Sequence, residues 1–248
     1  MKAVEIIDWL NEKIPISLAE NWDNSGLQLG NANKEIKKLG VCFQADLDTI
    51  KKAVKAETDF LITHHPLLSP THNPLKNIIN ADYEIFRLLM NNNITVFSCH
   101  TNWDKAKGGI METYAKLLKL SNTTTDGFVT TGDIPTTKTN DLIEELKKTL
   151  GINNIRVYCN TSIINRVSYS PGAGINKETI NTAIKHKAQA LISGDAKDGI
   201  TRYAIDSGLL LIDAGHYGTE HLGMKELAKN IKTRFKSLEV VYIDSEEL

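Results

Sequence analysis

The stretch DFLITHHPLLSP, from Asp59 to Pro70, decides how this chain is expected to fold. Its apolar and β-branched residues Phe60–Thr63 are typical of a buried strand. His64 and His65 follow directly, and then a proline, where the backbone must turn. Two adjacent histidines at the end of a strand suggest that something is bound there, with partners elsewhere in the chain.

The bulk composition is that of an ordinary globular protein. The chain has 248 residues, of which 41% are hydrophobic and 24% charged, and its formal net charge is -1. No long basic run stands out, so neither nucleic acid nor an anionic membrane is an expected partner. The opening MKAVEIIDWLNEKI has the spacing of an amphipathic helix rather than the continuous apolar centre of a signal peptide. The three cysteines are odd in number and far apart, which makes a disulfide framework unexpected. Together these properties lead us to expect a cytoplasmic α/β protein.

Short apolar runs alternate with amphipathic segments along the chain. Strands are expected at 38–43, 59–63 and 94–99, with helices between them, and this rhythm favours a mainly parallel or mixed sheet flanked by helices. The Thr-rich stretches SNTTTDG and TTGDIPTTKTND predict turns and a domain boundary. Beyond them the rhythm resumes, so the expected domains are residues 1–125 and residues 126–248.

The two halves also resemble each other. The first contains ETDFLITHH and then NNNITVFSCHTNWD; the second contains KAQALISGD and then DSGLLLIDAGHYGTE. In each half an apolar strand ends in histidine followed four residues later by a carboxylate: His100 with Asp104, and His216 with Glu220. An internal duplication follows, giving two similar α/β domains with a metal site between them.

The polar residues at these strand ends have the chemistry of a metal site. Ligand sites in parallel α/β sheets gather beyond the carboxyl ends of the strands, and imidazole with carboxylate is a usual donor set for Zn, Mn or Fe. One ion needs about three protein ligands, whereas five or six candidates favour two ions. Adjacent side chains leave an extended backbone in opposite directions, so His64 and His65 are expected to serve different ions. The candidates are His64, His65, His100, Asp104, His216 and Glu220.

The remaining histidines and Cys99 carry less information. His100 is either a ligand or a residue that orients Asp104. His72, His186 and His221 have no partner pattern and are predicted to lie on the surface. Cys99 is predicted to face the core as a small hydrophobic residue.

Four segments give the chain a family resemblance: ENWDNSGLQLG, THHPL, HTNWD and DAGHYGTE. Together they resemble the signature segments of the interacting-factor-three (Nif-three-like) family, whose members are named GTP cyclohydrolase I type 2 homologues or dinuclear metal-centre proteins. The segments keep the family's order between Glu20 and Glu220. The resemblance implies a ring-shaped homohexamer, a trimer of dimers whose metal sites face an internal cavity. It implies metal ligands at His64, His65, Asp104, His216 and Glu220, but does not make His100 a ligand.

Two divalent ions in one site would activate water for attack on a carbonyl or phosphoryl group, so hydrolysis is the expected reaction class. The expected substrate is a nucleotide or related small molecule, as the family's name suggests. Either Asp104 or Glu220 can bridge the ions, and His100 can act as general acid or base. The alternative is a non-catalytic metal-binding protein with an assembly or regulatory role.

Two loops carry a second possible meaning. WDNSGLQ is expected to be a loop after the first helix, either a capped turn or a segment beside the metals, with Asp23, Asn24 and Ser25 as hydrogen-bonding groups. SPGAG, from Ser170 to Gly174, leads into a helix whose free N–H groups could bind an anion, although a tight turn explains it equally well.

Overall fold

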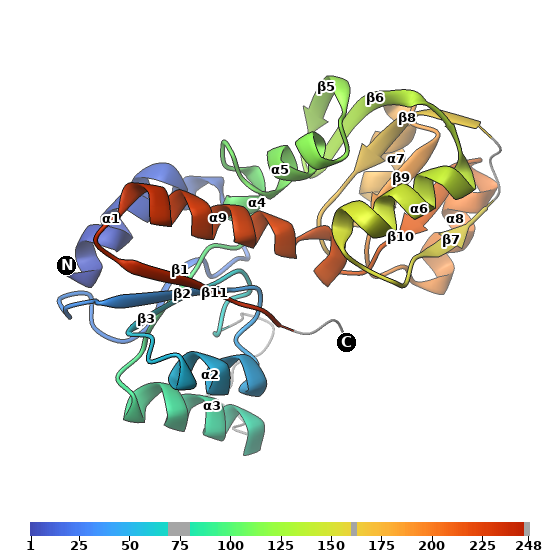
Figure 1. Ribbon diagram of the computed structural model, residues 1–248. Helices are drawn as coiled ribbons and strands as arrows, with labels where there is room; N and C mark the ends of the chain where they lie inside the picture. The colour runs from blue at the N-terminus through green and yellow to red at the C-terminus, as the bar shows by residue number, and fades with distance from the viewer. Residues whose placement is uncertain (69–79, 160–162, 246–248) are drawn as a thin grey trace. The chain divides into compact units, whose positions relative to one another are not determined.

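The computed structural model describes residues 1–68, 80–159 and 163–245 (Figure 1). These residues form two compact units, each built around one sheet. The first comprises Met1–Gly109 with the segment from Met224 onward, and the second comprises Ile110–Gly223. Within the described ranges, no helix combines the length and apolar character needed to cross a membrane.

The sheet of the first unit has five strands in the order β1-β4-β3-β2-β11. Strands β11, β2, β3 and β4 run parallel, and β1 is antiparallel to β4 at the edge. The carboxyl ends of β3 and β4 are therefore neighbours. The strands are β1 (Gly26–Leu29), β2 (Lys38–Cys42), β3 (Phe60–Thr63), β4 (Thr95–Ser98) and β11 (Glu239–Ile243).

Helices cover both faces of this sheet. The helices α2 (Leu47–Lys55) and α3 (Asn80–Asn91) pack on one face, where Ile50, Leu61 and Leu89 are fully buried. On the other face lie α1 (Ala3–Lys13) and α9 (His221–Arg234), as Figure 1 shows. Every residue of β3 is buried, which explains why this strand is continuously apolar up to its final threonine.

The second unit contains a six-stranded sheet in the order β5-β6-β8-β9-β10-β7. Its centre, β8-β9-β10, is parallel, whereas β5, β6 and β7 pair antiparallel. Helices α7 (Lys177–Lys185) and α8 (Asp198–Asp206) bury Ile180 and Ala204 against it. The strands are β5 (Ser121–Asp126), β6 (Val129–Lys138), β7 (Arg156–Tyr158), β8 (Ile163–Tyr169), β9 (Ala190–Ser193) and β10 (Leu210–Asp213). The helix α6 (Thr139–Leu150) follows β6 directly.

The two sheets share a core of the same topology. In the first unit three parallel strands lie in the order β4-β3-β2, and an antiparallel strand, β1, lies beside β4. In the second unit β10-β9-β8 have the same order, and antiparallel β7 lies beside β10. This correspondence is the one that the paired sequence segments predict, and both sheets are mixed and flanked by helices.

The Thr-rich segment expected to form turns is instead a β-hairpin. Strands β5 and β6 pair across a turn at Gly127, whose φ is +58°. Threonine is β-branched and favours an extended backbone, so the polarity of this segment concealed an exposed edge strand, β5, and its neighbour β6.

The division into units differs from a single cut between residues 125 and 126. Helix α5 (Ile110–Leu117) belongs to the second unit, where Tyr114 stacks on Tyr169 with a ring-centroid separation of 4.9 Å. The segment after Gly223 belongs to the first unit because β11 pairs with β2. A strand added from a distant part of the chain leaves no local signal in the sequence.

Candidate metal centre

The strand β3 ends in a braced turn that directs two imidazoles to one place. The Thr63 hydroxyl is 2.7 Å from the Ser98 hydroxyl on β4, and the N–H groups of His64 and His65 donate to the carbonyl of Phe43 at 3.1 and 3.3 Å. The extended alternation therefore stops at Thr63, and the two histidine rings lie with centroids 5.1 Å apart. The expectation that they diverge to opposite sides does not apply at this turn.

His64 is held with one ring nitrogen committed. Its Nδ1 is 2.8 Å from the carbonyl oxygen of Cys99, and because a carbonyl only accepts, Nδ1 carries the proton. Nε2 then offers a lone pair and lies 3.7 Å from Oδ1 of Asp104. Both side chains are buried. Asp104 belongs to the short helix α4 (Thr101–Lys105), which begins just after β4.

His100 completes a cluster of three imidazoles in the first unit. His64, His65 and His100 each place a ring nitrogen so that the three atoms lie within 4.8 Å of one another. The Nδ1 atom of His100 is 2.8 Å from Oδ1 of Asp23, whereas one of the roles left open for His100 was to orient Asp104. Asp23 lies 77 positions away in sequence, so spacing gave no reason to pair these residues.

The segment WDNSGLQ lies against this cluster and supports the turn after His65. The Asn24 amide donates to the carbonyl of Leu68 at 2.6 Å, and the Leu68 N–H donates to Oε1 of Gln28 at 3.1 Å. Part of the segment is the strand β1 rather than loop. Of the two meanings open for WDNSGLQ, the structure supports the one beside the imidazoles.

In the second unit His216 and Glu220 form a matching pair. They flank the short helix η2 (Tyr217–Thr219), and Nε2 of His216 is 3.1 Å from Oε2 of Glu220. The other ring nitrogen of His216, Nδ1, is 2.8 Å from Oδ2 of Asp195, which follows β9. Burial opposes a charge on His216, but Glu220 and Asp195 outweigh it and raise the pKa of this imidazole to about 9.

The glycine loop SPGAG packs against this pair. Gly172 has a φ of +53°, and a Cβ added to it would lie 2.7 Å from Nε2 of His216 and 2.9 Å from Cδ of Glu220. Its N–H donates to the Thr219 hydroxyl at 3.0 Å. The helix that follows is capped by Asn176, whose side chain accepts from two N–H groups of its first turn. The loop is therefore a tight turn that brings backbone close to the ligand pair, and the cap already uses the N–H groups that an anion would need.

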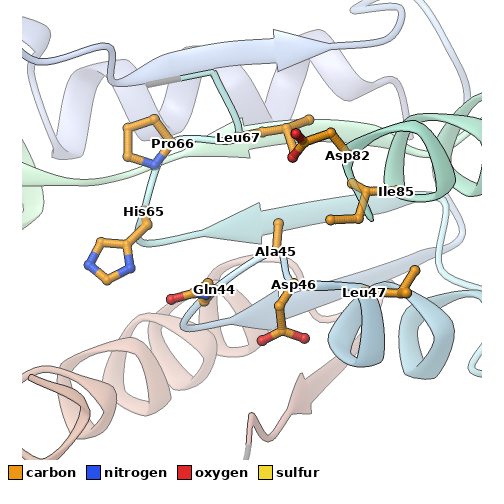
Figure 2. A pocket seen from close by; sticks show the side chains of 9 residues that line it. All are labelled: Gln44, Ala45, Asp46, Leu47, His65, Pro66, Leu67, Asp82 and Ile85. Atoms are coloured by element: carbon orange, nitrogen blue, oxygen red, sulfur yellow. The ribbon is translucent and has the colours of Figure 1, made fainter. Parts of the chain in front are cut away.

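A pocket of about 330 Å³ opens beside His65 in the first unit (Figure 2). Its wall combines aliphatic side chains with the polar groups Gln44, Asp46 and Asp82. This volume lies at the lower end of the range for small-molecule sites. The lining residues are Gln44, Ala45, Asp46, Leu47, His65, Pro66, Leu67, Asp82 and Ile85.

The other histidines divide differently from expectation. His221 was predicted to be at the surface but is buried, and its Nδ1 lies 2.8 Å from the carbonyl oxygen of Tyr217. His186 is partly buried and lies 3.1 Å from Asp126, and His72 lies outside the described residues. Cys99 is fully buried as predicted, and burial raises the pKa of its thiol.

The donors present fit divalent transition metals. Imidazole nitrogen and carboxylate oxygen are ligands for Zn, Fe and Mn. In His64 and His216 the Nδ1 atom is held by a hydrogen bond, as is usual in metal-binding histidines. The Nε2 atom of each ring is directed at a carboxylate. The structure thus provides His, Asp and Glu groups capable of binding metal.

The fold and these residues define a member of the Duf34/NIF3 (NGG1p interacting factor 3) family, and the chain belongs to it, since the family model matches residues 1–247. A relative from Methanocaldococcus jannaschii named GTP cyclohydrolase 1 type 2 homolog is 35% identical over 248 residues, covering 98% of this chain and 100% of the relative. A relative from Helicobacter pylori strain J99 named GTP cyclohydrolase 1 type 2 is 31% identical over 220 residues, covering 87% of this chain and 86% of the relative.

Solved structures agree with this assignment. Reduced HcgD from Methanocaldococcus jannaschii is 34% identical, with a TM-score of 0.87 that covers 99% of this chain and 98% of that one. The protein ybgI has a TM-score of 0.89 and 22% identity, covering 100% of this chain and 99% of that one. The second likeness concerns the fold alone.

Proposed function

We propose that the chain is a metal-dependent hydrolase that acts on a nucleotide or related small molecule. Its metal ligands are His64, His65 and Asp104 in the first unit, and His216 and Glu220 in the second. The observation that carries the proposal is the convergence of three imidazoles at the neighbouring ends of β3 and β4, one of them beside a buried carboxylate. Four buried or partly buried titratable side chains in one place have a high cost unless they bind something.

Two divalent ions, once bound, would supply Lewis acidity and lower the pKa of coordinated water. The protein's own groups do the rest. Cys99 and Asp195 fix the ring orientations of His64 and His216, so these ligands need little reordering when metal binds. His100 acts as general acid or base, since one of its ring nitrogens lies within 4.8 Å of those of His64 and His65.

The names of the relatives support a nucleotide as substrate. The Helicobacter pylori relative is named GTP cyclohydrolase 1 type 2, and it matches most of this chain. The pocket beside His65 has the size for a small molecule or for part of a nucleotide. Opening of a purine ring is a hydrolytic step, which agrees with the reaction class that the donor set favours.

We propose in addition a cytoplasmic homohexamer, a ring formed by a trimer of dimers. The support is the resemblance of the four sequence segments to the family. Light scattering coupled to size-exclusion chromatography measures the assembly directly, and a mass six times that of the 27.6 kDa chain is expected. A monomer at micromolar concentration contradicts the proposed assembly without affecting the metal ligands.

The test of function combines metal content with turnover. Protein purified without added metal is analysed for bound elements, reloaded, and assayed against GTP, other nucleotides and phosphoesters. We expect His65→Ala with Glu220→Ala to lose both metal and turnover, and His100→Ala to keep metal and lose turnover. His186→Ala is the matched control, since it removes a histidine bonded to Asp126.

Metal bound without turnover on any substrate would favour the alternative, a non-catalytic metal-binding protein with an assembly or regulatory role. Full metal content in the double variant would contradict the ligand assignment itself. Loss of turnover in the His186 control would show that the assay reports folding rather than the site.

A further inference from the structure

Asp23 is a buried carboxylate that the proposed metal ligands do not include. Its side chain has no exposed area. Oδ1 accepts from the N–H of Asn24 at 2.6 Å and faces Nδ1 of His100 at 2.8 Å. Oδ2 accepts from the hydroxyl of Ser25 at 2.9 Å, from the N–H of Thr101 at 3.1 Å, and from the hydroxyl of Thr101.

This environment keeps the carboxylate charged. Burial opposes ionisation, but the hydrogen bonds from His100, Thr101 and Ser25 outweigh it and hold the pKa of Asp23 well below its usual range. A charged carboxylate only accepts hydrogen bonds, so Nδ1 of His100 must be the donor. The proton of a neutral imidazole then sits on Nδ1, and the lone pair is on Nε2.

The rings around His100 show why it matters which of its nitrogens carries the proton. Its ring centroid is 5.1 Å from that of His64 and 5.5 Å from that of His65, and Trp22 packs edge-on against it at 5.8 Å. One ring nitrogen of His100 belongs to the cluster of three imidazole nitrogens. Because Nδ1 faces Asp23, we assign this nitrogen as Nε2. The same ring in the other tautomer would present an N–H there instead.

We propose that Asp23 is a positioning residue that fixes His100 in its Nδ1–H tautomer, so that an Nε2 lone pair faces the space shared with His64 and His65. The catalytic use of that lone pair rests on the proposed function, but the tautomer does not. The two aspartates Asp23 and Asp195 then play the same part in the two units, each accepting from Nδ1 of the histidine that follows β4 or β10.

The hydrogen bonds predict what an amide does in place of the carboxylate. In Asp23→Asn the amide oxygen is expected where Oδ2 lies, because the N–H and hydroxyl of Thr101 and the hydroxyl of Ser25 donate there. The amide NH₂ then faces His100 and donates to Nδ1, which moves the imidazole proton to Nε2. The shape of the side chain is kept and the hydrogen bond with His100 is reversed, while the bond from the N–H of Asn24 to Oδ1 is lost.

Nitrogen NMR of the full chain, labelled with ¹⁵N at histidine and treated with chelator, measures the tautomer at pH values where the imidazole is neutral. His100→Gln assigns the signal. We expect the Nδ1–H tautomer in the natural chain and the Nε2–H tautomer in Asp23→Asn. Thr101→Val is the matched control: it removes another hydrogen bond to Asp23 but leaves the one to His100, so its tautomer should be unchanged.

An Nε2–H tautomer in the natural chain overturns the proposal, and this measurement does not depend on whether the variant folds. An unchanged tautomer in a folded Asp23→Asn overturns it too. In metal-loaded protein we expect Asp23→Asn to lower turnover by about 100-fold or more, and His186→Ala to keep turnover. A chain without metal or turnover would refute the proposed function, while the tautomer would still be measurable.

Discussion

Replacing Gly172 by alanine tests whether His216 and Glu220 hold a metal ion. Gly172 has a φ of +53°, and its missing Cβ would lie 2.7 Å from Nε2 of His216, with Cδ of Glu220 at 2.9 Å. Real Cβ atoms stay at least 3.0 Å from such neighbours. The added Cβ meets side chains and not backbone, so we expect both side chains to move and the fold to survive.

The size of the movement decides the outcome. Oε1 of Glu220 is the atom nearest to the added Cβ and must move furthest, and Nε2 of His216 must retreat by about 0.3 Å to restore 3.0 Å. Metal–ligand distances are held to within roughly 0.2 Å. Changes that disturb ligand orientation cost about 10–100-fold in metal affinity. Since the added methyl group displaces two ligands, we expect a loss of at least about 100-fold, or about 2.8 kcal/mol at 1.4 kcal/mol per tenfold.

A matched control separates this effect from backbone strain. Gly127 has a φ of +58°, and a Cβ added there meets nothing within 4 Å. Gly127→Ala and Gly172→Ala should therefore both lose about 1–2 kcal/mol of stability from the left-handed backbone, while only Gly172→Ala loses metal. Chelator competition measures the affinity, and thermal unfolding of the metal-free proteins measures the strain. Wild-type affinity in a folded Gly172→Ala would refute the assignment of His216 and Glu220 as ligands.

Four further predictions concern the same units. The pKa of His216 is raised from 6.5 to about 9, so a metal ion that binds this imidazole below pH 9 must displace a proton. In chelator competition we therefore expect the metal affinity to rise by up to tenfold per pH unit between pH 6.5 and 9. The slope should be smaller in Glu220→Gln. Because the folded chain binds this proton more tightly than the unfolded chain, His216 stabilises the metal-free fold below pH 6.5, and this stability is lost as the pH rises through 9. The free energy of unfolding in urea, measured against pH, checks this. Asp195→Asn should lower metal affinity about 10–100-fold in the same competition assay, whereas unchanged affinity would show that ring orientation does not depend on this carboxylate. Leu61→Ala, in the fully buried β3, should cost about 2–5 kcal/mol in urea unfolding without changing the ligands, and a smaller loss would mean that the site collapses around the cavity.

The parallel strands were predictable because burial on both faces makes them continuously apolar. The ranges expected at 38–43, 59–63 and 94–99 contain β2, β3 and β4. The hairpin β5-β6 was missed because the threonines of β5 are exposed, and an exposed strand has the polarity of a turn. The return of β11 to the first unit was missed because pairing between distant segments depends on tertiary contacts.

The candidate site shows the same division. Histidines at strand ends were visible because strand ends collect ligands in parallel sheets, and three of them do converge. The aspartates behind them were not identified as their partners. Asp195 was detectable in principle, since it follows β9 as His64 and His65 follow β3. The motif WDNSGLQ marks Asp23 as a possible hydrogen-bonding group, but its partner His100 is 77 positions away, and no local sequence pattern connects residues at that separation.

Because the two units share a topology, the residues at their equivalent strand ends can be compared, and the two units contribute different metal-binding groups. Aligning the ends of β3 and β9 places Thr63 with Ser193, His64 with Gly194 and His65 with Asp195. The first unit has two imidazoles at this turn, whereas the second has a glycine, where a Cβ would lie 2.6 Å from the backbone of Gly215, and an aspartate that orients His216. After β4 and β10 the pattern is instead kept, with a histidine anchored by an aspartate and a carboxylate four residues later. The two units thus each place a histidine just beyond this strand, two residues after β4 and three after β10, and at the neighbouring turn the second unit has a group that supports a ligand where the first has two imidazoles.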